Sequence, residues 1–501
     1  MVSAGLDSIL ARRRLSQWPI IAAIGAIAAL GQEPLGLWPA TICALGLIFA
    51  LIRKAASGKQ ALGVGWIAGA GYFAVALSWI VEPFLVDLAR HGWMAPFALL
   101  GVSVGFGLFW AFVGWVTFKA GGQSIVFIGA FVFAEFARGY ALTGFPWAQL
   151  GHVLIDTAWL YLASYAGSLG LTALVLLGAI GVTVLIDGKW LFFAVMFGVL
   201  ACLFGASVGL TPKAGAIDQS PMIRIVHTNE MQQDRWDPDK IPVNFERKLE
   251  FTAGDDTGPS PALIVWPETS IPVLLERAQT ALDAIAQDAN GAPVIAGLQR
   301  FDGDGFFNSL IKLDGEGDVA AIYDKHHLVP FGEYLPFGET FAKFGIFGLS
   351  DTTGGGYQPG AGPQVLDIEG LGTALPLICY EGVFPQDVGG YDKRPDFLML
   401  ITNDAWFGEI SGPYQHLAQA RLRSAEQGLP MIRSANTGIS AMIDATGRIT
   451  HQMGLDEAGW IDAPLPPALP ATAYSRMGDW PIAALAFVIV GLGWFRARLS
   501  S

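Results

Sequence analysis

The chain has 501 residues, of which 52% are hydrophobic and only 15% are charged, and its mean hydropathy is +0.46. Soluble globular proteins carry about 25% charged residues, so much of this chain is expected to face lipid. The net charge of −13 argues against a nucleic-acid-binding protein, which needs a basic patch. Three cysteines, two of them in long apolar runs, exclude a disulfide framework and leave the redox compartment open.

The first 210 residues alternate long apolar runs with short polar breaks. A membrane-spanning helix needs about 20 mostly apolar residues. We predict seven spans here, of which the first and fifth are short and have uncertain limits: Trp18–Leu30, Leu35–Ile52, Ala61–Val81, Trp93–Phe118, Ser124–Phe136, Ala158–Ile186 and Trp190–Leu210. The basic start resembles a signal peptide, but no clear cleavage site follows it, so we expect a retained first helix.

Residues 211–479 have a different composition, because charges, prolines and glycines return at ordinary globular density. This length suits one large soluble domain. The apolar character returns in Trp480–Phe495, which makes an eighth span with a short tail. We therefore predict a membrane domain over 1–210, an extracytoplasmic domain over 211–479, and the eighth helix with its tail over 480–501.

The basic residues predict the orientation of the chain. With eight spans, they gather on one side of the membrane: Arg12–Arg14, Arg53–Lys59, Lys119, Lys189 and Arg496–Arg498. That side is expected to be cytoplasmic, together with both termini. The domain of residues 211–479 is then outside the cytoplasmic membrane, in the periplasm of a Gram-negative cell.

Strands and helices are predicted to alternate within residues 211–479. The expected strands are Ile223–Val226, Ala262–Trp266, Val294–Leu298, Phe307–Leu313, Val319–Tyr323, Ala374–Cys379, Phe397–Thr402, Ile432–Ser434, Ser440–Ile443 and Ile449–Gln452. The expected helices are Val243–Thr252, Val273–Gln287 and Tyr414–Gly428. Polar turns at 314–318 and 444–448 predict two hairpins. The mixture favours an α/β sandwich of layers over a purely parallel sheet.

Three ionisable residues follow strand-like stretches in this domain: Glu268, Lys325 and Cys379. Side chains at strand ends can converge in one crevice. Glu268 is then placed to take the Cys379 proton, which would make the sulfur a nucleophile. Lys325 is placed to stabilise the thiolate and the oxyanion that forms when the sulfur attacks a carbonyl. This scheme needs no metal and no cofactor.

Each of these residues also has a simpler interpretation. A single cysteine is more often a small buried hydrophobe than a nucleophile. Glu268 can be an acid at a helix N-terminus, and Lys325 an exposed lysine at a strand end. The adjacent His326 and His327 would point to opposite faces of a strand, so we do not expect them to bind a metal together.

The sequence around the three residues resembles the Glu–Lys–Cys blocks of the nitrilase, or carbon–nitrogen hydrolase, superfamily. These blocks are Val265–Thr269, Tyr323–Pro336 and Ile378–Gly382. A fuller resemblance is to the membrane-bound branch, the apolipoprotein N-acyltransferase family, and it is carried by Thr143–Gly151, Thr402–Gly408, Gly412–Arg421 and Arg433–Ser440. The resemblance covers nearly the whole chain, including the layout of seven spans, a domain and one span.

The resemblance implies a fold and a set of site residues. The fold is a multi-span α-helical membrane domain of eight helices plus a nitrilase-like αββα sandwich. Glu268 is the general base, Lys325 the stabiliser and Cys379 the nucleophile. The supporting or substrate-binding residues are Glu333, Tyr380, Glu381 and Trp236. From the sequence alone, Glu333 is equally a carboxylate that holds its loop, and Trp236 a packing residue.

The resemblance also implies the reaction. Cys379 takes an acyl chain from a glycerophospholipid as a thioester and passes it to the α-amino group of the diacylglyceryl-cysteine of an apolipoprotein. The enzyme is expected to be a monomer. Two alternatives stay open: a membrane-anchored amidase that hydrolyses a small amide, and a non-enzymatic transporter or sensor. The Phe337–Phe347 segment, with aromatic residues at helical spacing, is a candidate lid for lipid access.

Overall fold

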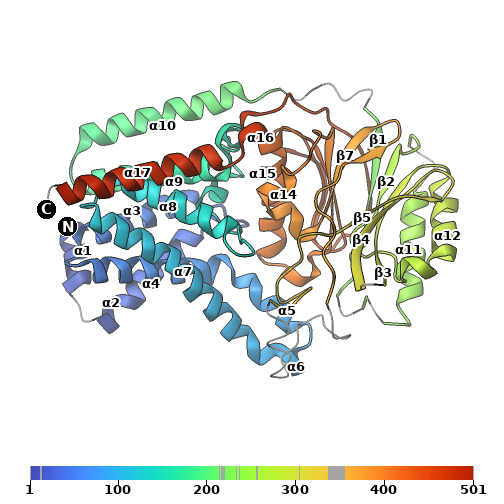
Figure 1. The fold of residues 1–501 in the computed structure, drawn as a ribbon, viewed down its shortest axis with the longest axis horizontal. Helices are drawn as coiled ribbons and strands as arrows, with labels where there is room; N and C mark the ends of the chain where they lie inside the picture. The colour runs from blue at the N-terminus through green and yellow to red at the C-terminus, as the bar shows by residue number, and fades with distance from the viewer. Residues whose placement is uncertain are drawn as a thin grey trace. The chain divides into compact units, whose positions relative to one another are not determined.

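A computed structural model of the chain describes residues 2–11, 14–213, 215, 220–232, 234–235, 237–255, 258–303, 305–336 and 356–499. The chain divides into two compact units, whose elements are labelled in Figure 1. The first unit contains Met1–Pro212, Ile410–Ala418 and Ala471–Ser501, and the second contains Lys213–Glu409 and Gln419–Pro470. The domain limits expected from composition stay predictions.

The first unit is helical, and each expected span falls on one of its helices. The longer helices are α2 (Arg14–Ala29), α3 (Trp38–Lys54), α4 (Gly58–Ala76), α7 (Ala95–Lys119), α8 (Ser124–Tyr140), α9 (Ala163–Ile186), α10 (Trp190–Leu210) and α17 (Trp480–Leu499). The shorter ones include α1 (Val2–Ala11), α5 (Glu82–Leu85), α6 (Leu88–His91) and α16 (Ala473–Met477).

Four stretches of the described chain are long and apolar enough to cross a membrane: Leu88–Lys119, Leu160–Ile186, Trp190–Leu210 and Trp480–Leu499. A fifth is added if α4 and the segment Ser78–Leu85, which are bent by 66° from each other, count as one span. The structure thus supports four or five spans, and the predicted number of eight is not confirmed.

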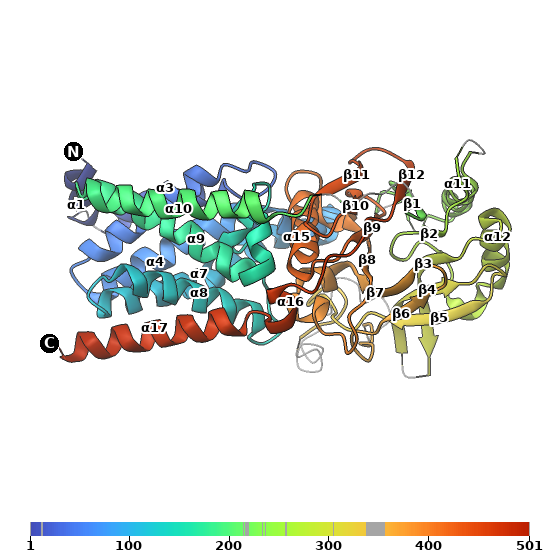
Figure 2. The same cartoon turned by 90° about the horizontal axis from the view of Figure 1, so that it is seen from above.

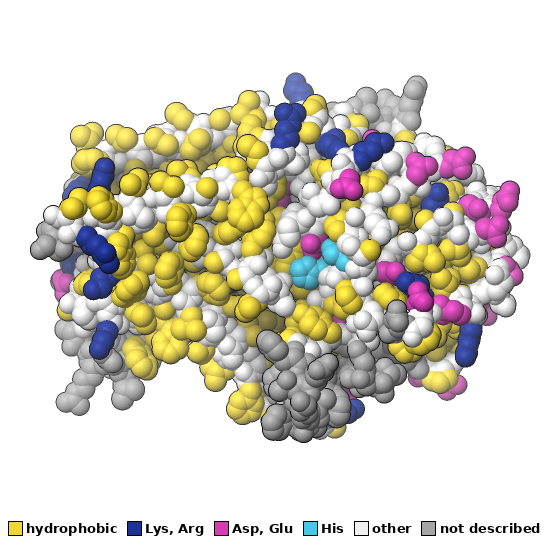
Figure 3. Space-filling view, viewed as in Figure 1, with side chains coloured by type: hydrophobic (Ala, Val, Ile, Leu, Met, Phe, Trp, Pro, Cys, Tyr) yellow, Lys and Arg dark blue, Asp and Glu magenta, His cyan; other side chains and the backbone are white. Residues whose placement is uncertain are grey.

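The helices of the first unit pack closely because small residues lie where they cross. A Cβ atom on Gly65 of α4 would lie 2.2 Å from the carbonyl oxygen of Trp110 on α7, and one on Gly114 would lie 2.4 Å from that of Ala61. Glycine therefore lets the two backbones touch, as in helix pairs within bilayers. The outer faces are apolar, and hydrophobic side chains cover α10 and α17 in Figure 3.

The second unit contains, among its described residues, two six-stranded sheets. The first sheet has the order β12-β1-β2-β3-β4-β5, with β12 Gly459–Pro464, β1 Met222–His227, β2 Leu263–Val265, β3 Val294–Asp302, β4 Gly305–Leu313 and β5 Val319–Asp324. The second has the order β11-β10-β9-β8-β7-β6, with β11 Ile449–Met453, β10 Ser440–Ile443, β9 Met431–Ala435, β8 Phe397–Thr402, β7 Gly372–Ile378 and β6 Leu366–Ile368.

The two sheets share one apolar core and carry helices on their outer sides. Ile225 and Val265 of the first sheet are in one buried cluster with Ile378 and Met399 of the second. Helices α11 (Ile241–Ala253) and α12 (Gln279–Ala289) lie on the outer side of the first sheet (Figure 1 and Figure 2). Helix α14 (Pro385–Val388) and residues 419–427 of α15 (Gly412–Gln427) lie beside the second sheet (Figure 1). The predicted αββα sandwich is confirmed.

The predicted strands and both hairpins are also found. The polar turns join β4 to β5 and β10 to β11, and both pairs are antiparallel. Two strands were not predicted. Strand β6 has only three residues, and β12 ends in a proline-rich segment, so pairing with β7 and β1 defines them more than local pattern does. Helix α12 begins at Gln279, later than expected, because Leu274 forms a bridge to Gln299.

Candidate active site

Glu268 lies in a tight turn just after β2 and is 7% exposed. Its Oε1 accepts a hydrogen bond of 2.7 Å from the side-chain amide of Asn308 on β4. Its Oε2 accepts one of 2.8 Å from the backbone N–H of Asn403, the residue after β8. The carboxylate is therefore oriented by donors from both sheets.

Lys325 follows β5 and is 1% exposed. Its Nζ lies 2.8 Å from Oε1 of Glu333 and 3.7 Å from Oε1 of Glu268. Asn308 also donates to Glu333, over 3.2 Å, and its carbonyl accepts from the backbone N–H of Lys325. An ammonium and an amide thus link the two carboxylates.

Cys379 is the first residue of a short 3-10 helix, Cys379–Val383, that directly follows β7. Its φ angle is +51°, in the left-handed region that non-glycine residues rarely adopt, so the chain turns sharply at the sulfur. The residue is 7% exposed. Its sulfur interacts electrostatically with Glu268 and Lys325 and hydrogen-bonds to Thr402. The three residues predicted at strand ends therefore do come together.

The pKa values of these groups indicate where the proton lies at rest. Burial raises the pKa of the Cys379 thiol, the charge of Glu268 raises it further, and Lys325 offsets only part of this. Burial alone would lower the Lys325 pKa, but Glu333 and Glu268 outweigh it and raise that pKa. Burial also raises the pKa of Glu268, against the effect of Lys325. These directions favour a neutral thiol beside an ammonium in the resting site.

Glu333 combines the two interpretations that the sequence left open. One carboxylate oxygen contacts Lys325 and Asn308, as a supporting residue of the site would. The other accepts a hydrogen bond of 2.8 Å from the backbone N–H of Val329, which holds its own loop. The same side chain therefore fixes the loop and the lysine.

Glu381 is fully buried two residues after Cys379. It accepts hydrogen bonds of 2.7 Å from the backbone N–H of Ile378, 2.7 Å from that of His326 and 2.9 Å from the hydroxyl of Tyr323. It thereby ties the turn that carries the sulfur to the segment that carries Lys325. Tyr380 is also buried, and its ring lies edge-on to His327 and Phe384.

The prediction that His326 and His327 point to opposite faces is wrong, because β5 ends at Asp324 and both residues lie in the loop beyond it. Both reach Asp387 of α14: Nδ1 of His327 lies 2.7 Å and Nε2 of His326 lies 3.6 Å from its oxygens. Nδ1 of His326 lies 2.6 Å from Glu381. Within the described residues, no group of three or more His, Cys, Asp and Glu side chains is arranged to hold a metal ion.

His326 should make stability depend on alkaline pH. Burial lowers its pKa, but the hydrogen bonds to Asp387 and Glu381 outweigh this and raise it to about 10. A histidine whose pKa is raised on folding stabilises the folded state at pH values below its ordinary pKa, near 6.5. This stabilisation is lost as the pH rises through the raised pKa of about 10. Purified His326→Gln should therefore have a lower melting temperature than the parent protein at pH 7. The difference between the two melting temperatures should shrink towards pH 10.

The matched control is His451→Gln on β11, which replaces a partly exposed histidine and should melt as the parent protein does. Thermal unfolding in one detergent over a pH series measures both variants. A difference in melting temperature for His326→Gln that stays constant through pH 10 would contradict the prediction.

Two predicted features lie outside the described residues: Trp236 and the Phe337–Phe347 segment. Three contributors were not predicted. Asn308 is a polar residue within an apolar strand, so the sequence alone could have marked it as a candidate site residue. Asn403 lies in a block that carried the resemblance, but it acts on Glu268 through its backbone N–H, which no side-chain pattern reveals. Arg235 precedes Trp236, and its side chain donates to the carbonyl oxygen of Glu268 over 2.6 Å.

The site also has a buried ionic support. Arg433 of β9 and Asp404 are both fully buried, and Nη2 lies 2.6 Å from Oδ2. The other oxygen of Asp404 accepts from the hydroxyl of Thr402 over 2.9 Å. Because Thr402 hydrogen-bonds to the Cys379 sulfur, this ion pair fixes the strand end against which the sulfur packs.

A two-sheet αββα sandwich with Glu, Lys and Cys at its strand ends defines the class of carbon–nitrogen hydrolases. The model of the carbon–nitrogen hydrolase family matches residues 252–473, and that of the apolipoprotein N-acyltransferase N-terminal domain matches residues 24–181. With the relatives described next, these matches show that the chain belongs to the apolipoprotein N-acyltransferase family, as the sequence resemblance predicted.

The relatives are similar over nearly their full length. The chain is 34% identical over 507 residues to an apolipoprotein N-acyltransferase of Rhodopseudomonas palustris, covering 95% of this chain and 94% of that protein. It is 35% identical over 508 residues to one of Bradyrhizobium diazoefficiens, covering 93% and 92%. A solved CN-hydrolase superfamily protein from Xanthomonas campestris is 18% identical, covers 53% of this chain and 97% of that one, and has a TM-score of 0.37.

Proposed function

We propose that the protein transfers a fatty acyl chain from a glycerophospholipid to the α-amino group of the N-terminal diacylglyceryl-cysteine of an apolipoprotein. The observation that carries this proposal is the convergence of Glu268, Lys325 and Cys379 in a chain that also has four or five membrane-length apolar stretches. The family supports the choice of acceptor, because the relatives are named apolipoprotein N-acyltransferases.

The first half-reaction loads the enzyme. Glu268 takes the proton from the Cys379 thiol as the sulfur attacks the ester carbonyl of the phospholipid. The Lys325 ammonium stabilises the oxyanion, and a backbone N–H just after Cys379 is the second donor. When the C–O bond breaks, the leaving alkoxide takes the proton from Glu268. The products are a lysophospholipid and a thioester on Cys379.

In the second half-reaction, the acyl chain passes from the enzyme to the acceptor. The free α-amine of the acceptor attacks the thioester carbonyl, and Glu268 takes a proton from the amine nitrogen. The C–S bond breaks, an amide forms, and the proton returns to the sulfur. The same carboxylate is the base in both half-reactions, so its orientation by Asn308 and Asn403 affects the rate of each.

The proposal also concerns where in the cell the enzyme binds its lipid donor. We propose a multi-pass protein of the bacterial inner membrane, with eight spans, both termini in the cytoplasm and the catalytic domain in the periplasm. A soluble amidase needs no such spans, whereas an enzyme that uses a phospholipid must reach its ester. We also propose that the protein acts as a monomer.

The test is intact-mass analysis of the purified protein in detergent with a phosphatidylethanolamine of defined acyl chains. We expect an adduct of one acyl chain on Cys379, which a diacylated lipopeptide with a free α-amine discharges as a triacylated product. The same lipopeptide acetylated at its α-amine is the matched control and should leave the adduct in place. No adduct, or an adduct that water discharges as fast as the amine, would reject the transferase and, in the second case, favour the amidase.

A further inference from the structure

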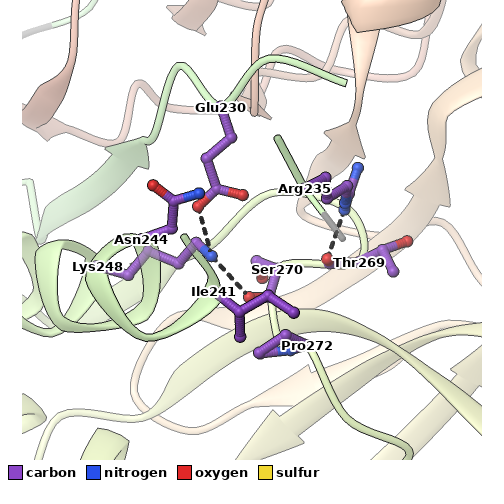
Figure 4. Close-up of a pocket in the computed structure, with 8 residues that line it drawn as sticks. All are labelled: Glu230, Arg235, Ile241, Asn244, Lys248, Thr269, Ser270 and Pro272. Carbon is purple, nitrogen blue, oxygen red and sulfur yellow. Dashed lines mark hydrogen bonds and ion pairs between the residues drawn. The ribbon is translucent and has the colours of Figure 1, made fainter. Parts of the chain in front are cut away.

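The turn that carries Glu268 is held by two buried cations that the mechanism above does not use. Arg235 donates from Nη2 to the carbonyl oxygen of Glu268 over 2.6 Å and also to that of Thr269. Lys248 of α11 donates from Nζ to the carbonyl oxygen of Ser270 over 2.9 Å. Arg235 is 8% exposed and Lys248 is 3% exposed. Figure 4 shows both side chains converging on this turn.

The turn needs such support, because its backbone is strained. Thr269 has a φ angle of +48°, in the left-handed region that a β-branched residue rarely adopts. On the other side the turn is pressed against Gly297 of β3, where a Cβ atom would lie 2.4 Å from the Thr269 nitrogen. The carbonyl of Gly297 accepts from Ser270 over 2.7 Å. The turn is therefore clamped between a strand and two cations.

The two cations, Lys248 and Arg235, differ in the groups that their charges affect. Lys248 forms an ion pair of 2.6 Å with the buried Glu230, which largely neutralises it. Arg235 interacts electrostatically with Glu268 as well as with Glu230. Burial raises the pKa of Glu268, and the positive charges of Lys325 and Arg235 both work against this rise. Arg235 thus affects the proton affinity of the carboxylate as well as its place.

We propose that Arg235 is a positioning residue for Glu268: its guanidinium holds the strained turn so that the carboxylate faces Asn308, Asn403 and Cys379. This inference rests on the proposed role of Glu268 as the base. Removing the guanidinium lets the turn relax and moves the carboxylate away from the sulfur. A misplacement of about 1 Å can cost roughly 100-fold in rate.

The test uses the full-length protein and a probe that needs no lipid. The rate at which iodoacetamide alkylates Cys379, followed by peptide mass over a pH series, reports how readily Glu268 removes the thiol proton. The charged and titratable groups that face Glu268 are Lys325, Glu333, Cys379, Tyr357 and Arg235. Of these, only Arg235 is changed, in Arg235→Gln and Arg235→Lys.

Arg235→Gln should slow alkylation by roughly 100-fold and move the acid limb of the pH profile to higher pH, because Glu268 then holds its proton more tightly. Arg235→Lys keeps the charge and should slow the reaction with a much smaller displacement of the limb. Arg277→Gln, which removes one exposed positive charge from the same unit, is the matched control and should match the parent.

Arg235→Gln with the rate and pH profile of the parent would overturn the inference, and so would a slower rate with an unmoved acid limb. If Arg235→Gln does not fold, Arg235→Lys carries the test, since parent-like alkylation in that variant would equally overturn it. Acyl loading from phosphatidylethanolamine is measured separately. A parent protein that loads no acyl chain rejects the proposed function, whereas the alkylation profile still decides the role of Arg235.

Discussion

Cys379→Ser should reduce acyl loading from phosphatidylethanolamine at least roughly 1,000-fold, the scale on which loss of a catalytic nucleophile acts in other covalent enzymes. Serine keeps the shape of the side chain, but its hydroxyl is a far weaker nucleophile at neutral pH than a thiol whose proton a neighbouring base removes. The loss should be large because burial raises the pKa of the Cys379 thiol, so that in the proposed mechanism its reactivity depends on Glu268 and Lys325. Single-turnover intact-mass measurement of the adduct gives the rate.

The chain provides its own controls for this result. Cys43 on α3 and Cys202 on α10 are exposed cysteines, and Cys43→Ser and Cys202→Ser should load at the parent rate. An adduct that forms at the parent rate on Cys379→Ser, or that maps to another residue, would remove the sulfur from the mechanism. Glu268→Gln should also block loading, because the amide cannot take the thiol proton.

The sequence predicted that Glu268, Lys325 and Cys379 would lie together because each follows a strand-like stretch, whereas their catalytic roles are implied by the family resemblance and stay a prediction. Glu268 follows β2, Lys325 follows β5 and Cys379 follows β7, so topology brings them to one edge of the sandwich. Contacts made by backbone groups could not be predicted in the same way. The N–H of Asn403 and the N–H of Ile378 orient two carboxylates, and any residue type supplies such a donor.

The histidines show that local geometry does not reveal tertiary partners. Placing His326 and His327 on opposite faces assumed a strand, whereas the predicted strand ended at Tyr323 and β5 ends at Asp324. The loop then lets both rings reach Asp387. The partner itself lies about 60 residues further along the chain, on a four-residue helix that has no strong local pattern. Tertiary contacts of this kind are not encoded in the local sequence.

The apolar helices of the first unit were predicted in place but not in length. Helix α2 has 16 residues, and α3 and α8 have 17 each, which is short of the ~20 that a perpendicular span requires. Pro39 at the start of α3 sets where that helix begins, because proline suits the first turn of a helix. Apolar composition therefore locates these segments, while their ends depend on local breaks and on packing.

Arg433→Met should destabilise the second unit by about 3–5 kcal/mol, because it leaves the Asp404 carboxylate buried without its counter-ion. Arg433 and Asp404 are both fully buried, with Nη2 and Oδ2 2.6 Å apart. Arg433 also donates from Nε to the carbonyl oxygen of Ile439 over 3.1 Å, so two interactions are lost. Methionine keeps most of the volume, which limits any cavity effect. For a unit of this size, the thermal midpoint should fall by roughly 10 °C.

A double-mutant cycle separates the ion pair from general damage to the core. Asp404→Asn alone should also destabilise, since the arginine then lacks its counter-ion, whereas Arg433→Met with Asp404→Asn should recover part of the loss. Lys240→Met is the control, because Lys240 is half exposed in its pair with Asp234 and its loss should destabilise the protein far less. If the double variant is as unstable as the two single losses added together, the charges do not interact. Acyl loading should fall with Arg433→Met even below its melting range, because Asp404 would no longer hold the Thr402 hydroxyl against the sulfur.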